Sequence, residues 1–227
     1  MTYYDLSHSI RSGMPVFPGD PPVDITPTAT VEDDGYHVAA LHCGSHTGTH
    51  IDAPSHVFRD GSELDSIAVD EFVFDARLVD CTGKSPREPI EAAELPTEDG
   101  TADLLLCHTG WDEYWGTDRY FDHPYLTPGA AEHCREAGWS VGLDTLNPDP
   151  TPTENATGSE PTGFQAHHTL LGNGLFVIEN LTGLERVPAA NSTVTLAAFP
   201  LPIADADGAP VRAVAIDSDV PGDGDPF

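Results

Sequence analysis

The chain has 227 residues, 39% of them hydrophobic, and a net charge of −29 that arises from 38 acidic residues against 9 Lys and Arg. This balance excludes nucleic acid and anionic membranes as partners, because binding to phosphate groups needs cations. No apolar run is long enough to cross a membrane and the first residues, MTYYDLSHSI, lack the pattern of a signal peptide, so we expect a cytoplasmic protein.

The length predicts a single domain over residues 1–227, large enough to bury a sizeable core. Hydrophobic residues are plentiful and periodic, which argues against disorder except at the ends, and we expect residues 217–227 to form an acidic tail that is either mobile or lies against a partner. A strongly acidic surface suits concentrated salt, where screening weakens the repulsion between like charges, so the charge predicts a halophilic protein. The four widely separated cysteines predict reduced thiols.

Extended segments begin the chain. Residues 2–9 predict an edge strand, and the prolines of MPVFPGDPP at 14–22 enforce extended and turn geometry. This rigid segment presents Phe17 at a fixed place, either as a packed surface aromatic or as an aromatic wall of a substrate pocket. Residues 36–43 alternate as a strand does and lead into the segment that follows.

Residues 46–56, HTGTHIDAPSH, carry three imidazoles and one carboxylate within eleven positions. Imidazole nitrogen and carboxylate oxygen are ligands of borderline-soft divalent ions. A turn at Gly48 followed by extended chain would place His50 and Asp52 on one side, because strand side chains alternate. His46 could then curl in across the turn as a third ligand. The segment therefore predicts a metal site rather than a polar loop.

Two features refine this prediction. Pro54 would end the strand and leave His56 near the metal without making it a ligand. The segment lacks the H-E-x-x-H pattern of zinc proteases, and Cys43 has no C-x-x-C companion, which argues against a cysteine-based structural zinc site.

The middle of the chain alternates between apolar runs and polar segments. Residues 62–72 have helical spacing, and residues 86–100 suggest a short surface helix and a loop. Thr127 as N-cap, Pro128 at the first position and Gly138 as the stop mark a helix. Strands are predicted at 72–80, 103–108 and 139–144, and residues 147–163 predict a loop that could border the pocket or act as a lid.

The C-terminal part predicts a helix at 164–171, a strand at 174–181 and further strands at 192–199 and 211–216. Glu179 is the one carboxylate within the apolar run of the 174–181 strand. Because an ionised Glu is costly there unless it is paired or binds a metal, it is the best remote ligand on physical grounds, and a salt-bridged core Glu is the alternative. His167 on the preceding helix is its natural companion.

The motif His-x-Gly-Thr-His-x-Asp-x-Pro-x-His, which residues 46–56 match at each of these positions, resembles the signature of the cyclase family of metal hydrolases. This family includes bacterial kynurenine formamidases and isatin hydrolases. The resemblance extends to His-x-x-Leu-Leu followed by Ile-Glu-Asn-Leu, and it singles out His167 rather than His168. It also supports Phe17 as a pocket wall, although the family usually has Trp there.

The resemblance implies an α/β fold of the swivelling β/β/α type, with a β-rich mixed-sheet core and a few peripheral helices. It implies a homodimer or homotetramer as well. For the metal site, the resemblance implies two ions in the formamidase branch of the family and one ion, often manganese, in the isatin hydrolase branch.

The ligand set itself favours two ions. Five candidates are too many for one catalytic ion that keeps an open position, and two ions bridged by Asp52 would accommodate them all: His46, His50, Asp52, His167 and Glu179. Zinc suits the imidazoles best, and manganese tolerates the carboxylates. Such ions would activate water and polarise a carbonyl oxygen, and His56 would be the general acid and base.

We therefore predict a metal-dependent amidohydrolase that acts on a small aryl amide, converting N-formylkynurenine to kynurenine and formate. A hydrolase of cyclic amides such as isatin is the alternative. A metal-storing or metal-sensing module could use the same ligands, but it would need neither His56 nor Phe17. The absence of a G-x-S-x-G motif argues against serine-hydrolase chemistry.

Overall fold

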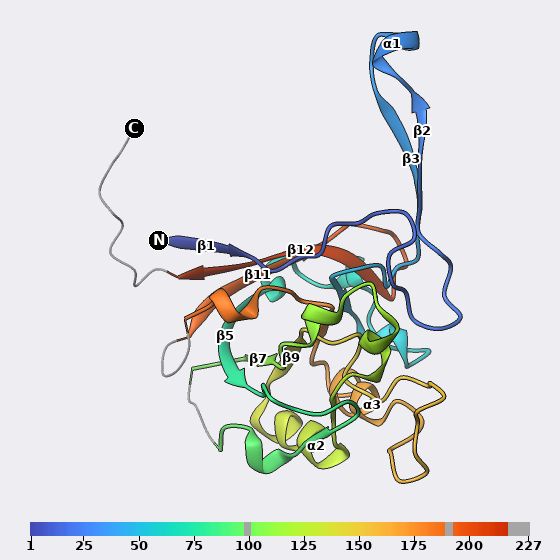
Figure 1. The fold of residues 1–227 in the computed structure, drawn as a ribbon. Helices are drawn as coiled ribbons and strands as arrows, with labels where there is room; N and C mark the ends of the chain where they lie inside the picture. Colours follow the sequence, from blue (N-terminus) through green and yellow to red (C-terminus); the bar gives the residue numbers. More distant parts are fainter. Residues whose placement is uncertain (98–100, 189–192, 218–227) are drawn as a thin grey trace.

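The computed structural model describes residues 1–97, 101–188 and 193–217 (Figure 1). Its main element is a mixed sheet of eight strands: β1 (Thr2–Asp5), β4 (His50–Asp52), β5 (Val73–Asp80), β7 (Leu104–His108), β9 (Ser140–Leu143), β10 (Val177–Glu179), β11 (Val194–Pro200) and β12 (Gly208–Asp217). The strand order is β1-β12-β11-β5-β7-β9-β10-β4. Because β4 pairs with β12 as well, the sheet closes on itself.

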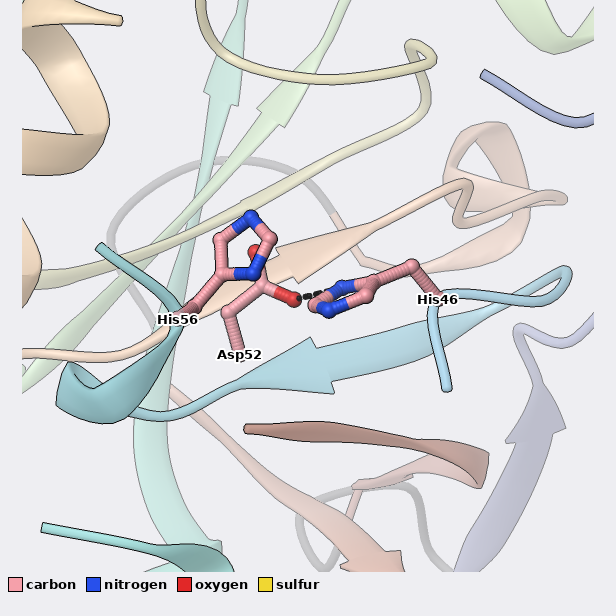
Figure 2. A group of neighbouring side chains, drawn as sticks. All are labelled: His46, Asp52 and His56. Carbon is pink, nitrogen blue, oxygen red and sulfur yellow. Dashed lines mark hydrogen bonds and ion pairs between the residues drawn. The ribbon is translucent and has the colours of Figure 1, made fainter. Parts of the chain in front are cut away.

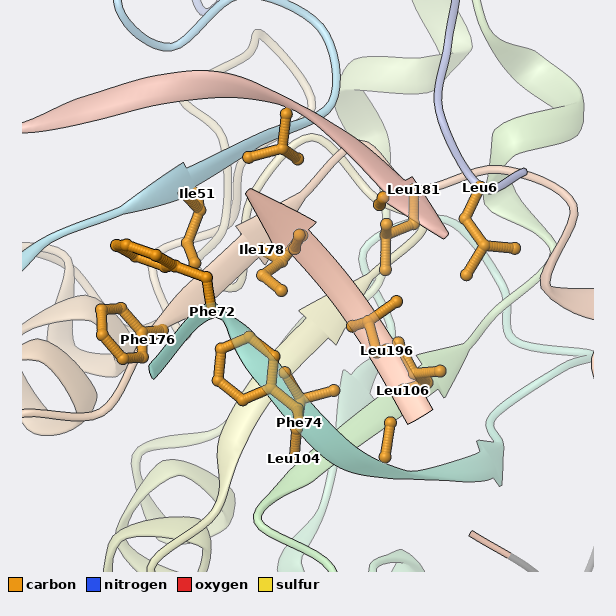
Figure 3. Close-up of a cluster of buried hydrophobic side chains, with 14 of the residues drawn as sticks. Leu6, Ile51, Phe72, Phe74, Leu104, Leu106, Phe176, Ile178, Leu181 and Leu196 are labelled. Carbon is orange, nitrogen blue, oxygen red and sulfur yellow. The ribbon is translucent and has the colours of Figure 1, made fainter. Parts of the chain in front are cut away.

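The inside of this closed sheet is a hydrophobic core (Figure 3). Side chains of a strand alternate between two faces, and β7 shows the result clearly. Leu104 and Leu106 point into the core, whereas Leu105 and Cys107 belong to a second cluster outside it. Packing inside is close: a Cβ at Gly142 would lie 2.9 Å from Leu106 Cδ2. A side chain at that position would therefore displace the core.

Two helices cover the outer face of the parallel strands β7, β9 and β10 (Figure 1). Helix α2 (Pro128–Ala137) connects β7 to β9, and α3 (Gln165–Leu171) connects β9 to β10. The Thr127 hydroxyl caps α2 by accepting a hydrogen bond from the Ala130 N–H, and Gly138 ends the helix at φ +77°. The helix signal at Thr127–Gly138 is therefore confirmed.

A hairpin projects away from the closed sheet (Figure 1). It consists of β2 (Asp24–Ala29), a short helix α1 (Val31–Asp34) and β3 (Val38–His42). The sequence predicts the second strand but not the first or their pairing. Several of its large apolar side chains are exposed; Leu41, for example, keeps 63% of its surface accessible.

The fold class is confirmed: a β-rich mixed sheet carries a few peripheral helices. A further short pair, β6 (Pro89–Ile90) and β8 (Tyr125–Leu126), lies outside the main sheet. The predicted helical segments at 62–72 and 86–100 are only 3-10 turns, at Leu64–Ser66, Val69–Phe72 and Ala92–Glu94. Residues 98–100, position 192 of the predicted strand and tail residues 218–227 lie outside the described residues.

Two predictions of the sequence concern thiols and membranes. The four cysteines are free, three of them buried and Cys43 exposed, which confirms the expectation of unpaired thiols. Among the described residues, no helix combines the length and the apolar character needed to cross a membrane.

Candidate metal centre

The candidate site lies on the outer face of the closed sheet, where β4 pairs with β10. Alternation along β4 turns Ile51 into the core, so that His50 and Asp52 face the other way. The antiparallel register sets Glu179 directly opposite His50. A carboxylate far along the chain thus joins the local motif because two short strands pair.

Four buried side chains converge there. His50 Nε2 lies 3.1 Å from Glu179 Oε2 and 3.4 Å from Asp52 Oδ1. His167, on α3, approaches the same two carboxylates: its Nε2 lies 3.0 Å from Glu179 Oε1 and 3.5 Å from Asp52 Oδ2. The neighbouring His168 is exposed, so only one of the two adjacent histidines reaches the cluster.

His46 and His56 lie on either side of Asp52 (Figure 2). Gly48, at φ +64°, forms the turn that brings His46 back to the strand, and His46 Nδ1 lies 2.8 Å from Asp52 Oδ1. His56 ends the 3-10 turn Pro54–His56, with its ring centroid 4.0 Å from that of His46. Two groups with ligand atoms close enough for an ion share Asp52: His46, Asp52 and His56, and His50, Asp52 and Glu179.

Asp207 also reaches the site, although nothing in the sequence predicts it. Its Oδ2 lies 3.0 Å from His46 Nε2 and 3.2 Å from His56 Nδ1. Asp207 directly precedes β12, and the next residue, Gly208, leaves room for the imidazole: a Cβ there would lie 2.5 Å from His46 Cε1. In the sequence, Asp207 resembles any acidic residue of a surface loop, and only the Asp-Gly pair before a strand could have marked it.

In two of the site histidines, His50 and His167, the Nδ1 nitrogen is fixed as a hydrogen-bond donor. His50 Nδ1 donates to the Gly48 carbonyl at 2.8 Å, and His167 Nδ1 donates to Asp149 Oδ2 at 2.7 Å. Asp149 also accepts the N–H of Ala166 and of His167, which anchors the start of α3. Metal-binding histidines use such contacts to present the other nitrogen. The sequence placed Asp149 in the pocket-bordering loop at 147–163 without singling it out.

The residues fit a divalent cation. Among the residues that the structure describes, His50 Nε2 and Asp52 Oδ2 are buried and form no well-aligned hydrogen bond, although each lies 3.1–3.5 Å from an ion-pair neighbour. Buried polar atoms normally find partners, because leaving them unsatisfied is costly. Imidazole nitrogen and carboxylate oxygen that face the same point are the donor set of zinc and manganese sites, and an ion there would satisfy both atoms.

The electrostatics of the cluster agree with this fit. Burial opposes charge on Asp52, yet the His46 and His50 imidazoles hold the pKa of this carboxyl well below its usual value. Burial likewise opposes protonation of His46, but Asp52 and Asp207 raise the pKa of His46 to about 10. The carboxylates thus favour a positive charge within the cluster. Bound divalent ions would supply that charge and would replace the protons on the histidines.

A cavity of about 310 Å³ opens onto the cluster. His46, His56, His167 and Glu179 line it on the side of the ligands. Phe17 lines it as well, in a tilted contact with Phe164 whose ring centroids are 6.1 Å apart. Phe17 thus lines the cavity and also packs against the cluster of Trp111, Tyr120 and Leu146.

Trp111 is buried, and its indole N–H donates to the Tyr120 carbonyl. It packs with Tyr120 and Leu146 in a hydrophobic cluster separate from the two larger ones.

Comparisons with known proteins agree with this architecture. Residues 4–150 match the family model "Putative cyclase". The kynurenine formamidase of Salinibacter ruber is 34% identical over 227 residues, which cover 97% of this chain and 100% of that protein.

Solved structures resemble the chain over most of its length. An isatin hydrolase bound to the product analogue thioisatinate superposes with a TM-score of 0.84 at 24% identity, over 94% of this chain and 91% of that one. A predicted metal-dependent hydrolase from Bacillus stearothermophilus gives a TM-score of 0.73 at 26% identity, over 94% and 97%. The resemblance seen in residues 46–56 is confirmed, and the chain belongs to the cyclase family.

Proposed function

We propose that the protein is a metal-dependent amidohydrolase that converts N-formylkynurenine to kynurenine and formate. One observation carries the proposal: His50, Asp52 and Glu179 converge, with unsatisfied polar atoms, beside a cavity that has aromatic walls. Near-full-length relatives named kynurenine formamidase support the linear amide as substrate.

Two divalent ions, zinc or alternatively manganese, would be held by His46, His50, His167 and Glu179, with Asp52 between them. When bound, such ions lower the pKa of water and polarise the amide carbonyl. Asp149 and the Gly48 carbonyl orient His167 and His50 for this role.

The remaining residues act on the substrate. His56 lines the cavity, and its Nδ1 donates to Asp207. This leaves Nε2 to take a proton from the attacking water and to deliver it to the departing amine. Phe17 provides an aromatic face against which the aryl group packs.

The first test measures turnover of N-formylkynurenine and isatin, with metal content determined on the same sample in high salt. We expect turnover of the formamide that depends on the bound metal. Turnover of isatin alone would favour the cyclic-amide hydrolase, which structural similarity to isatin hydrolases supports as the second candidate. Tight metal binding without turnover of either compound would favour the metal-binding module.

The second test separates His56 from the ligands. The His56→Ala variant should keep its metal and lose turnover. Because His56 also lies in a group with His46 and Asp52 that could hold an ion, loss of metal from this variant would make it a ligand instead.

We also propose that the protein works in concentrated salt in the cytoplasm. The net charge of −29 supports the first point, and four free cysteines support the second, since thiols stay reduced in that compartment. The unfolding midpoint should rise with salt concentration; a midpoint independent of salt would contradict the proposal.

A homodimer or homotetramer is proposed as well, with the β2–β3 hairpin as the contact. A two-stranded hairpin is marginally stable alone, and this one exposes Tyr36, Val38 and Leu41. Light scattering on wild type and Leu41→Glu should show a multimer that the substitution weakens. A wild-type monomer would contradict this proposal.

A further inference from the structure

Asp20 shares a rigid turn with Phe17, and both line the cavity. The Asp20 N–H donates to the Phe17 carbonyl at 3.0 Å, and Gly19 between them adopts φ +107°, a conformation that a side chain would disfavour. Pro18 and Pro21 stiffen the same segment. The turn therefore offers an aromatic face and a carboxylate at fixed places beside each other.

The two carboxylates that line the cavity differ in their partners. Glu179 contacts His50 and His167. Within the described ranges, the Asp20 side chain forms no hydrogen bond or ion pair, and it is exposed to solvent. No Lys or Arg is present among the described residues that line the cavity. At Asp20 the cavity thus offers a negative charge that none of the described residues neutralises.

A substrate can reach both features at once. Phe17 and Phe164 are already in contact, so an aryl ring would pack against them rather than between them. Its amide would point to the ligand cluster, where bound ions would repel a second positive charge. An amine on the aryl side chain would therefore face the mouth, towards Asp20, and a carboxylate on the same side chain would meet no cation and stay in water.

We propose that Asp20 is a subsite for a protonated amine, so that the pocket prefers aryl amides whose ring carries an aminoalkyl side chain. This inference rests on the proposed function and names its substrate class. It also explains how the pocket would favour a linear formamide with a free amine over a neutral cyclic amide.

Binding of two matched aryl ketones tests the subsite without requiring turnover. Kynuramine carries a primary amine, and 2′-aminopropiophenone lacks it but is otherwise similar. Calorimetric titration of metal-loaded protein, at the lowest salt concentration that keeps it folded, should show about threefold to fivefold tighter binding of the amine, as expected for an exposed ion pair. High salt should reduce this difference.

The Asp20→Asn variant should bind both probes equally and leave the affinity of the neutral ketone unchanged. Glu32→Gln removes the same charge at the tip of the hairpin, in α1, and should keep the wild-type preference. Wild-type protein that binds neither probe, or that shows no preference for the amine, would overturn the subsite. Equal weakening of both probes in Asp20→Asn would also overturn it, because Asp20 would then only position Phe17.

Kinetics distinguish this subsite from the proposed function. If the protein hydrolyses N-formylkynurenine, Asp20→Asn should raise KM about threefold to fivefold and leave kcat within about twofold, while KM for formanilide stays unchanged. Absence of turnover in the wild type would reject the formamidase but not the amine subsite, which the binding measurement decides independently.

Discussion

Strands β7 and β4 follow the same alternation and bury different chemistry on their outer faces. Both turn apolar side chains into the closed sheet, such as Leu106 and Ile51. On the outside, Leu105 of β7 packs beneath the helices in a hydrophobic cluster, whereas β4 buries His50 and Asp52. Burial alone therefore does not distinguish the stabilising face from the functional one.

What distinguishes them is whether the buried groups are satisfied. Burial of the apolar side chains on β7 stabilises the fold, because it removes apolar surface from water. Buried charges on β4 lose hydration, and two of their polar atoms find no hydrogen-bond partner among the described residues. The outer face of β4 is thus built for a cation, and its stability and its function should separate by substitution.

The largest effect is expected from His50→Ala. This variant should lose its metal and more than about a hundredfold in turnover, because even residues that only orient ligands are worth tenfold to a hundredfold. Metal analysis of the purified variant and turnover at saturating substrate measure both effects. The exposed His168→Ala is the control and should behave as wild type. Full metal content in His50→Ala would break the distinction between the two faces.

Ile51→Ala, one residue along the same strand, should affect the opposite face. Ile51 is fully buried in the core, so its truncation should cost about 2–5 kcal/mol of unfolding free energy. Denaturant titration measures this cost, and the metal content per folded molecule should stay unchanged. Ile203→Ala, at an exposed position, should cost much less. Loss of metal without loss of stability would mean that the two faces are not independent.

A buried histidine outside the site sharpens the comparison. Both nitrogens of His123 are satisfied, by the Pro124 carbonyl and the Thr151 hydroxyl, each at 2.7 Å. Burial lowers the pKa of His123 from 6.5 to about 4. The folded protein therefore resists protonation of His123, and the stability that the neutral ring contributes is fully present above pH 6.5 and is lost as pH falls towards 4.

This loss should reach at most about 3 kcal/mol. Unfolding free energies at pH 7, 5.5 and 4.5 should fall less steeply for His123→Gln than for wild type, with metal content unchanged at pH 7. The exposed His37→Gln should follow the wild-type slope. Parallel slopes for His123→Gln and wild type would show that His123 is protonated freely in the folded state.

The sequence predicts the local half of the site well because short-range geometry determines it. Alternation along an extended segment and a turn at Gly48 suffice to gather His46, His50 and Asp52. Glu179 is recognisable because an ionisable residue in an apolar strand needs a partner. The choice of His167 over His168 came from family resemblance, and the structure buries the former while the latter is exposed.

The pairing of strands that are distant in the chain cannot be predicted from local sequence patterns. The sheet closes because β4 pairs with β12, and no local pattern specifies which distant strands pair. That closure pairs Gly208 with Asp52 and thereby brings Asp207 to the site. The first hairpin strand, DITPTA, is not predicted by the sequence because it contains Pro27 and is mostly exposed, so that apolar alternation is weak.

The smallest effect on turnover is expected from substitution of Asp207. Asp207→Asn keeps the shape of the side chain but removes the charge that holds His56 through Nδ1. We expect kcat to fall about tenfold with KM and metal content nearly unchanged, because the residue orients the proton-transfer group without touching substrate. The acidic limb of the pH profile of kcat should shift as well, which a purely structural role would not cause.

Asp205→Asn is the matched control, since Asp205 lies two positions away in the same loop and Asn tolerates its φ of +55°. It should leave kcat and the pH profile at wild-type values. If Asp207→Asn loses metal, Asp207 acts through His46, which it also contacts, rather than through His56. If neither kcat nor the pH profile changes, the outer face of β4 needs only its own residues and those of β10 and α3, and the closing strand β12 contributes structure alone.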